Sequence, residues 1–217
     1  MKQNTIKTIE DTGIVGVLRG IVRDDALRIG EALLAGGVNC MEVTYKPDGD
    51  WSETAKTIEA LCTHFGDEMK VGAGTVMFEK QIEMTAQAGG LYVISPNVNR
   101  DIIKKTCEMG LVSIPGAFTP TECQDAHEAG ADFVKLFPMT GMGPIYVQML
   151  TGPLPHIKFL VVGGVTEENF ADFIRAGAIG MGGGLPFGFG EAIKTRDFSI
   201  ITKKVKVYKQ ILDQTRG

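Results

Sequence analysis

A recurring order runs along this chain: an amphipathic helical pattern, one or two glycines, and then a short apolar run. The glycines that close helical patterns in this way are Gly36, Gly37, Gly89, Gly90, Gly110, Gly130 and Gly177. Glycine tolerates the left-handed backbone that ends a helix, and each time a predicted strand follows within a few residues. The repeat therefore predicts successive strand and helix units around a parallel sheet.

Eight such units can be counted. The predicted strands are Ile14–Leu18, Asn39–Thr44, Lys70–Ala73, Leu91–Ile94, Val112–Ile114, Phe133–Phe137, Phe159–Val162 and Ile179–Gly182. The predicted helices between them include Asp24–Ala35, Ser52–Phe65, Glu79–Ala88, Thr121–Ala129 and Glu167–Ala176. Eight parallel units with no Pro-rich or Ser-rich linker predict an α/β fold, a single-domain (β/α)8 TIM barrel over residues 1–217.

Two further helices are expected at the ends of the chain. Met1–Asp11 is predicted to be an extra N-terminal helix that caps the barrel floor, and Ile200–Leu212 a long closing helix. The alternative fold is a doubly wound open sheet, which carries a GxGxxG turn after its first strand. Arg19-Gly20-Ile21 occupies that turn here, so the barrel is favoured.

Charge and hydrophobicity narrow the classes of partner. The 217 residues carry a formal net charge of −4, without a basic footprint for nucleic acid or a polybasic segment for a membrane surface. The first residues lack the apolar stretch of a signal peptide, and no run reaches the roughly 20 apolar residues that span a bilayer. We therefore expect a cytoplasmic protein whose partner is a small molecule.

The cysteines and histidines give no sign of a disulfide framework or a metal site. The four cysteines form no CxxC pair, and thiols stay reduced in the cytosol. His64, His127 and His156 are isolated from one another, without HExxH or similar spacing. We expect neither a metal nor a cofactor.

Lys135 is the unusual residue among the polar groups at the C-terminal ends of predicted strands, where TIM barrels place their active sites. It lies within Phe133–Phe137, and strand alternation puts it on the same face as the two phenylalanines. Burial there should lower its pKa and leave a free amine that can attack a ketone. A lysine that snorkels to solvent or pairs with a carboxylate is an equally open interpretation.

Glu42 raises the same question, because Met41 and Val43 flank it within a predicted strand. A carboxylate in such a place is either half of an ion pair or a general base with a raised pKa. Both Glu42 and Lys135 could face the barrel mouth, so a buried ion pair between them is a further alternative.

Three other segments could bind an anion. Arg19 follows the first strand, where its fork could hold a carboxylate at two points, although a surface arginine that caps a helix is the commoner case. The glycine-rich turns 162–165 and 182–184 follow strands seven and eight, where barrels often present backbone N–H groups to phosphate. Each glycine cluster alone is weak evidence.

Six motifs occur together and in order. They are Glu42-Val43-Thr44, Val71–Val76, Ile94-Ser95-Pro96-Asn97, Ile114-Pro115-Gly116 with Thr119–Glu122, Val134–Pro138, and Gly163-Gly164-Val165 with Glu168-Asn169. With them the chain resembles the 2-keto-3-deoxy-6-phosphogluconate (KDPG) and 4-hydroxy-2-oxoglutarate (KHG) aldolases, from about Gly13 to Gly184.

The resemblance implies a metal-free class I aldolase, usually a homotrimer, that cleaves a 2-keto-4-hydroxy acid into pyruvate and an aldehyde. Lys135 matches the family's Schiff-base lysine, Glu42 its general acid/base, and Arg19 an arginine that holds the keto-acid carboxylate. The positions that match the lining of the pyruvate pocket are Thr75, Pro96, Pro115 and Phe137. The glycines expected to bind substrate are Gly163, Gly164, Gly182, Gly183 and Gly184.

The sequence departs from the family pattern at the phosphate end of the site. Tyr45-Lys46-Pro47 stands where the phosphogluconate enzymes have an arginine. Val162 stands where those enzymes have a threonine, and in this the chain looks more like the phosphogalactonate branch. Leu185 aligns with the serine expected after the last glycine turn. Phosphorylated and non-phosphorylated sugar acids are therefore both open as substrates.

Two other classes of function compete with the aldolase. A barrel isomerase or epimerase would use Glu42 as its base and Lys135 as an electrostatic partner, but the sequence lacks the metal ligands expected for such an enzyme. A non-catalytic binding barrel would not need both Lys135 and Glu42.

Overall fold

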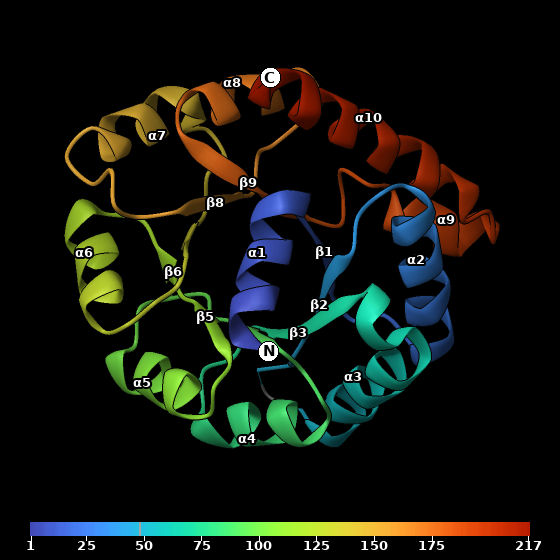
Figure 1. Cartoon of the computed structure of the whole chain (residues 1–217). Coiled ribbons are helices and arrows are strands. Elements are labelled where there is room, and N and C mark those ends of the chain that lie inside the picture. The colour runs from blue at the N-terminus through green and yellow to red at the C-terminus, as the bar shows by residue number, and fades with distance from the viewer. Residues whose placement is uncertain (48) are drawn as a thin grey trace.

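Nine parallel strands pair in one continuous order, β5-β4-β3-β2-β1-β9-β8-β7-β6, within residues 1–47 and 49–217, the part of the chain that the computed structural model describes. Their bounds are β1 Ile14–Leu18, β2 Cys40–Thr44, β3 Lys70–Gly74, β4 Tyr92–Ile94, β5 Val112–Ile114, β6 Gly116–Ala117, β7 Val134–Leu136, β8 Phe159–Val162 and β9 Ala178–Gly183. Apart from the N-terminal helix, which lies over the centre of the barrel, the helices form a ring outside the strands (Figure 1), as expected for a (β/α)8 TIM barrel.

The fifth barrel strand is divided in two. β5 pairs with β4 and β6 pairs with β7, and only Pro115 separates the two short strands. Proline has no N–H to donate to a ladder, but its carbonyl accepts a hydrogen bond from the Lys135 N–H at 2.9 Å. The segment 112–117 thus reaches both neighbours, and the eight predicted strands are confirmed with this one interruption.

The helices lie between the strands in the predicted order. Their bounds are α1 Lys2–Thr12, α2 Arg23–Ala35, α3 Ser52–Phe65, α4 Glu79–Gln87, α5 Arg100–Glu108, α6 Pro120–Glu128, α7 Gly143–Thr151, α8 Phe170–Arg175, α9 Phe189–Thr195 and α10 Ser199–Arg216, with a 3-10 turn η1 Gly66–Glu68 after α3. α8 begins three residues later than predicted, because the Asn169 side chain accepts from the Thr166 N–H and donates to the Gly164 carbonyl. α10 extends beyond the predicted closing helix at both ends.

Alternation along the strands produces two hydrophobic cores. One fills the space between the strands and the outer helices. The other fills the barrel interior and consists of Ile9, Val15, Cys40, Tyr92, Ile94, Val112, Ile114, Phe133 and Leu160. Ile9 belongs to α1, which lies across one end of the barrel (Figure 1), so the N-terminal helix closes the floor as predicted. The opposite end carries the C-terminal ends of the strands.

Among the described residues, no helix combines the length and apolar character that a bilayer crossing requires.

Candidate active site

Lys135 is the central residue of β7 and projects into the barrel interior. Its neighbours Val134 and Leu136 pack in the outer core, while Phe133 packs in the inner one. Lys135 is only 7% exposed, and its Nζ lies 4.8 Å from the centroid of the Phe137 ring. The predicted alternation is therefore present, and the side chain stays inside instead of snorkelling to solvent.

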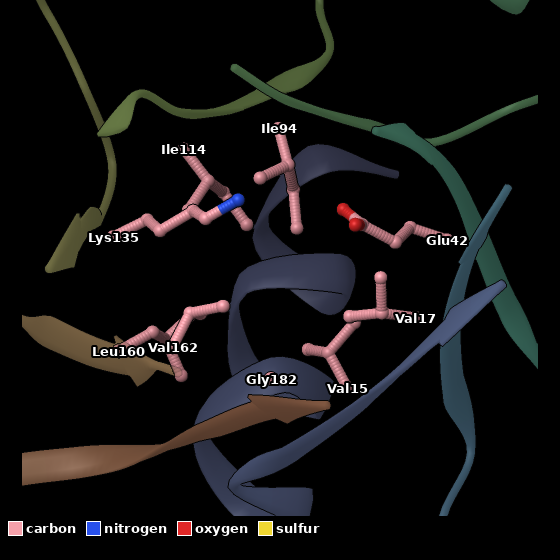
Figure 2. Close-up of a pocket in the computed structure, with 9 residues that line it drawn as sticks. All are labelled: Val15, Val17, Glu42, Ile94, Ile114, Lys135, Leu160, Val162 and Gly182. Atoms are coloured by element: carbon pink, nitrogen blue, oxygen red, sulfur yellow. The ribbon is translucent and has the colours of Figure 1, made fainter. Parts of the chain in front are cut away.

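Glu42 is the central residue of β2 and enters the same interior from the other side. It is 2% exposed, and its buried Oε2 has no hydrogen-bond partner among the described residues. Figure 2 shows the Glu42 carboxylate and the Lys135 amine pointing toward one another. In the described part of the chain, no contact between them falls within the 4.0 Å of an ion pair. The two groups face each other across a gap.

That gap is a small cavity with an apolar wall. Its lining consists of Val15, Val17, Glu42, Ile94, Ile114, Lys135, Leu160, Val162 and Gly182. Apart from Glu42 and Lys135, these residues carry no ionisable group. This apolar lining could have been predicted from the strand sequences, because strand alternation points these side chains to the interior together with Lys135 and Glu42.

Burial pushes both ionisable groups toward their neutral forms. Desolvation raises the pKa of Glu42 above its ordinary value, and the positive charges of Lys135 and Arg19 oppose that rise. Desolvation also lowers the pKa of Lys135; the Glu42 charge opposes this shift and the Arg19 charge adds to it. An amine with a lowered pKa beside a carboxyl with a raised pKa can act as a nucleophile with a proton donor and acceptor.

Gly74 makes room for Glu42, and sequence reasoning missed it. A Cβ atom at Gly74 would lie 2.5 Å from Glu42 Oε1, closer than any side chain permits. The Gly74 carbonyl also accepts from the Tyr45 N–H at 2.8 Å, which ties the ends of β2 and β3 together. A glycine at the end of a strand was the only available signal.

The structure brings some of the predicted site residues into direct contact and leaves others around the mouth. Gly182 lines the cavity with Lys135 and Glu42, and Phe137 contacts the lysine amine. Arg19 is exposed just beyond β1. The others, which lie at or just after strand ends without lining the cavity, are Thr75, Pro96, Pro115, Gly163, Gly164, Gly183 and Gly184.

Thr75 has a left-handed backbone, with φ of 57°. This conformation is unusual for a β-branched residue and costs of order 1–3 kcal/mol. Thr75 directly follows Gly74 at the end of β3 and is half-buried. Strain of this kind is concentrated at functional sites.

The glycine turn after β8 packs against a residue that sequence reasoning did not select. Gly163 and Gly164 have φ of 90° and 73°, and a Cβ at Gly164 would lie 2.8 Å from Thr140 Cα. Thr140 follows β7, so the turns after β7 and β8 are in close contact. In the next turn, Leu185 is 92% exposed.

The prediction that the three histidines are isolated is wrong for one pair. His127 on α6 and His156 after α7 meet edge to face, with ring centroids 4.7 Å apart. The two residues are distant in sequence, and only the packing of α6 beside the end of α7 brings them together. Among the described residues, no group of three or more His, Cys, Asp or Glu side chains could hold a metal.

Comparison with known proteins identifies the family of this barrel. The family model of the KDPG and KHG aldolases matches residues 5–204. The chain belongs to this family. As a KDPG/KHG-type aldolase it is a carbon–carbon lyase.

Relatives within the aldolase family cover most of the chain. The 2-dehydro-3-deoxy-6-phosphogalactonate aldolase of Escherichia coli is 36% identical over 170 residues, which cover 78% of this chain and 81% of the relative. The KDPG aldolase of Legionella pneumophila, solved with pyruvate captured as a covalent carbinolamine, superposes with a TM-score of 0.83 at 28% identity and covers 94% of this chain and 97% of that one.

A third match is a protein cage designed by fusing symmetric oligomeric domains, with a TM-score of 0.84 at 30% identity. It covers 94% of this chain and 73% of the cage subunit.

Proposed function

We propose that this aldolase is a class I enzyme that forms a Schiff base through Lys135 and reversibly cleaves a 2-keto-4-hydroxy acid. The substrate is a 2-keto-3-deoxy sugar acid, its phosphate, or 4-hydroxy-2-oxoglutarate. The products are pyruvate and an aldehyde such as glyceraldehyde 3-phosphate or glyoxylate. The observation that carries this proposal is the buried amine of Lys135 facing the Glu42 carboxyl across an apolar cavity.

Lys135 supplies the nucleophile and the electron sink. Its neutral amine adds to the C2 carbonyl to form a carbinolamine, which loses water to give a protonated imine. The C4 hydroxyl then loses its proton, the C3–C4 bond breaks, and its electron pair moves into the imine to give an enamine and the free aldehyde. Protonation of the enamine at C3 and hydrolysis of the imine release pyruvate and restore the amine.

Glu42 moves the protons of this sequence. As a carboxylic acid it gives a proton to the hydroxyl that leaves the carbinolamine, and as a carboxylate it accepts the C4 hydroxyl proton, directly or through water. The raised pKa of Glu42 suits a group that must do both near neutral pH. A well-placed acid/base step contributes about 10²- to 10⁴-fold in rate.

The remaining residues hold the substrate. Arg19 binds the keto-acid carboxylate, and Phe137 packs beside the Schiff-base nitrogen. Thr75, Pro96 and Pro115 form the rim above the pyruvate. The backbone N–H groups of the turns at Gly163–Gly164 and Gly182–Gly184 face the distal end of the acid, where an anionic group would be bound.

At these two turns, phosphate binding rests on backbone groups. The side chain of Leu185 is exposed and cannot donate a hydrogen bond, and Val162 contributes only an apolar surface. We therefore infer that the enzyme discriminates weakly between phosphorylated and non-phosphorylated substrates.

We further propose that residues 1–217 form one domain, that the enzyme is cytoplasmic, and that three copies associate. The assembly of a structural neighbour from symmetric oligomeric domains supports association. The surface that we assign to it is the α7 face, defined as Met142, Ile145 and Met149, which are 36%, 63% and 69% exposed. Their spacing places these apolar side chains on one side of the helix, where a second copy would cover them.

Borohydride reduction in the presence of pyruvate tests the proposal. It should fix pyruvate covalently on Lys135, and the absence of such an adduct would exclude Schiff-base chemistry.

A further inference from the structure

Thr44 connects the two strands that carry Glu42 and Arg19. It is the last residue of β2, two positions after Glu42, so strand alternation places both on the interior side. Its side chain is buried, and its hydroxyl donates a hydrogen bond to the Leu18 carbonyl oxygen at 3.2 Å. Leu18 is the last residue of β1 and directly precedes Arg19.

This bond lies where the pairing of the two strands ends. The register of β1 and β2 closes at Leu18 and Val43. Beyond Leu18 the backbone leaves the strand, and Gly20 turns it with φ of 66°. Arg19 and Gly20 are both exposed. The hydrogen bond from the buried Thr44 side chain to the Leu18 carbonyl therefore holds the backbone directly before Arg19.

We propose that Thr44 is a positioning residue, whose hydroxyl holds the backbone before Arg19 so that the guanidinium can bind the keto-acid carboxylate. This inference rests on the proposed function, in which Arg19 makes that contact. The positive charge of Arg19 lowers the pKa of both Glu42 and Lys135, so the guanidinium lies within electrostatic reach of the cavity. A loosely held Arg19 would spend less time in that position.

Two substitutions at this position separate the hydroxyl from the shape of the side chain. Thr44→Val keeps the β-branched shape and removes the donor, whereas Thr44→Ser keeps the donor. We expect Thr44→Val to raise the pyruvate concentration for half-maximal borohydride trapping by about three- to tenfold, the effect of one lost hydrogen bond, and Thr44→Ser to restore it. Trapping at saturating pyruvate should stay within about twofold of wild type.

A double-mutant cycle with Arg19→Ala decides whether Thr44 acts through Arg19. The proposal predicts that Thr44→Val adds no further loss of pyruvate affinity once Arg19 is absent. An equal loss with and without Arg19, or no loss in either background, would overturn it. Because the cycle compares Thr44→Val with and without Arg19, any effect of Thr44→Val that does not involve Arg19 is the same in both backgrounds and cancels. Wild-type protein that gives no pyruvate adduct would instead contradict the aldolase proposal, so the two failures are distinguishable.

Discussion

A Cβ atom on Gly74 would lie 2.5 Å from Oε1 of Glu42, so the missing side chain at one residue determines where the carboxylate of the other can lie. The two residues belong to paired strands, β3 and β2, and both stand near the mouth of the barrel. Because no described residue is a hydrogen-bond partner for the buried Oε2 of Glu42, the position of this side chain depends on packing more than on hydrogen bonds. This relationship can be tested by filling the space.

Gly74→Ala should displace the Glu42 carboxylate and slow aldol cleavage by up to about 10²-fold, the effect of a misplaced catalytic group. It should also slow the exchange of pyruvate methyl protons with deuterated water, and we expect Glu42→Gln to do the same. NMR measures the exchange. Gly190→Ala is the matched control, because a Cβ there would meet no atom of the described residues within 4 Å. Normal exchange in both Gly74→Ala and Glu42→Gln would remove Glu42 from the mechanism.

Much of this architecture is visible in the sequence, because strand alternation and helix-ending glycines are local properties. They locate the barrel strands and place Lys135 and Glu42 inside. Gly74 and Thr140 were missed because their importance depends on contacts with residues on neighbouring strands and turns. The interruption at Pro115 could not be predicted either. A proline interrupts a strand only where a neighbouring strand would otherwise accept a hydrogen bond from the backbone N–H that proline lacks, and the sequence does not show that pairing.

The pH dependence of Schiff-base formation should reveal the environment of Lys135. Burial lowers its pKa, so trapping should increase with pH and level off below 10.5, where an ordinary lysine loses its proton. Arg19 contributes to the lowering, so Arg19→Ala should move the midpoint upward. The test follows the borohydride trapping rate against pH at saturating pyruvate, with Lys80→Ala as a remote charge control. A midpoint near 10.5 in the wild type would mean that the amine is not desolvated.

Leu185→Ser should create the hydroxyl that the glycine turn lacks. A hydrogen bond to a charged phosphate is worth about 1.5–3 kcal/mol, so the KM for a phosphorylated substrate should fall by roughly tenfold to a hundredfold. The KM for 4-hydroxy-2-oxoglutarate should not change. Since Leu185 is exposed, the substitution should leave the fold intact. Equal effects on both substrates would show that this turn does not contact the phosphate.

The double variant Ile145→Lys and Met149→Lys should dissociate the oligomer, because two charges would be buried in the contact on the α7 face. Sedimentation should then show a smaller species than the wild type at the same concentration. Val207→Lys is the control, because Val207 is an exposed apolar residue on α10, away from α7. An unchanged sedimentation coefficient in the double variant would place the contact elsewhere.

The central claim is that the Lys135 amine forms the covalent bond to pyruvate. Its most direct measurement is peptide mapping by mass spectrometry after incubation with pyruvate and borohydride, with Lys135→Met treated in parallel. The account predicts one reduced pyruvate adduct per chain on the peptide that contains Lys135, and none in Lys135→Met. An adduct on another lysine, or full aldolase activity in Lys135→Met, would contradict it.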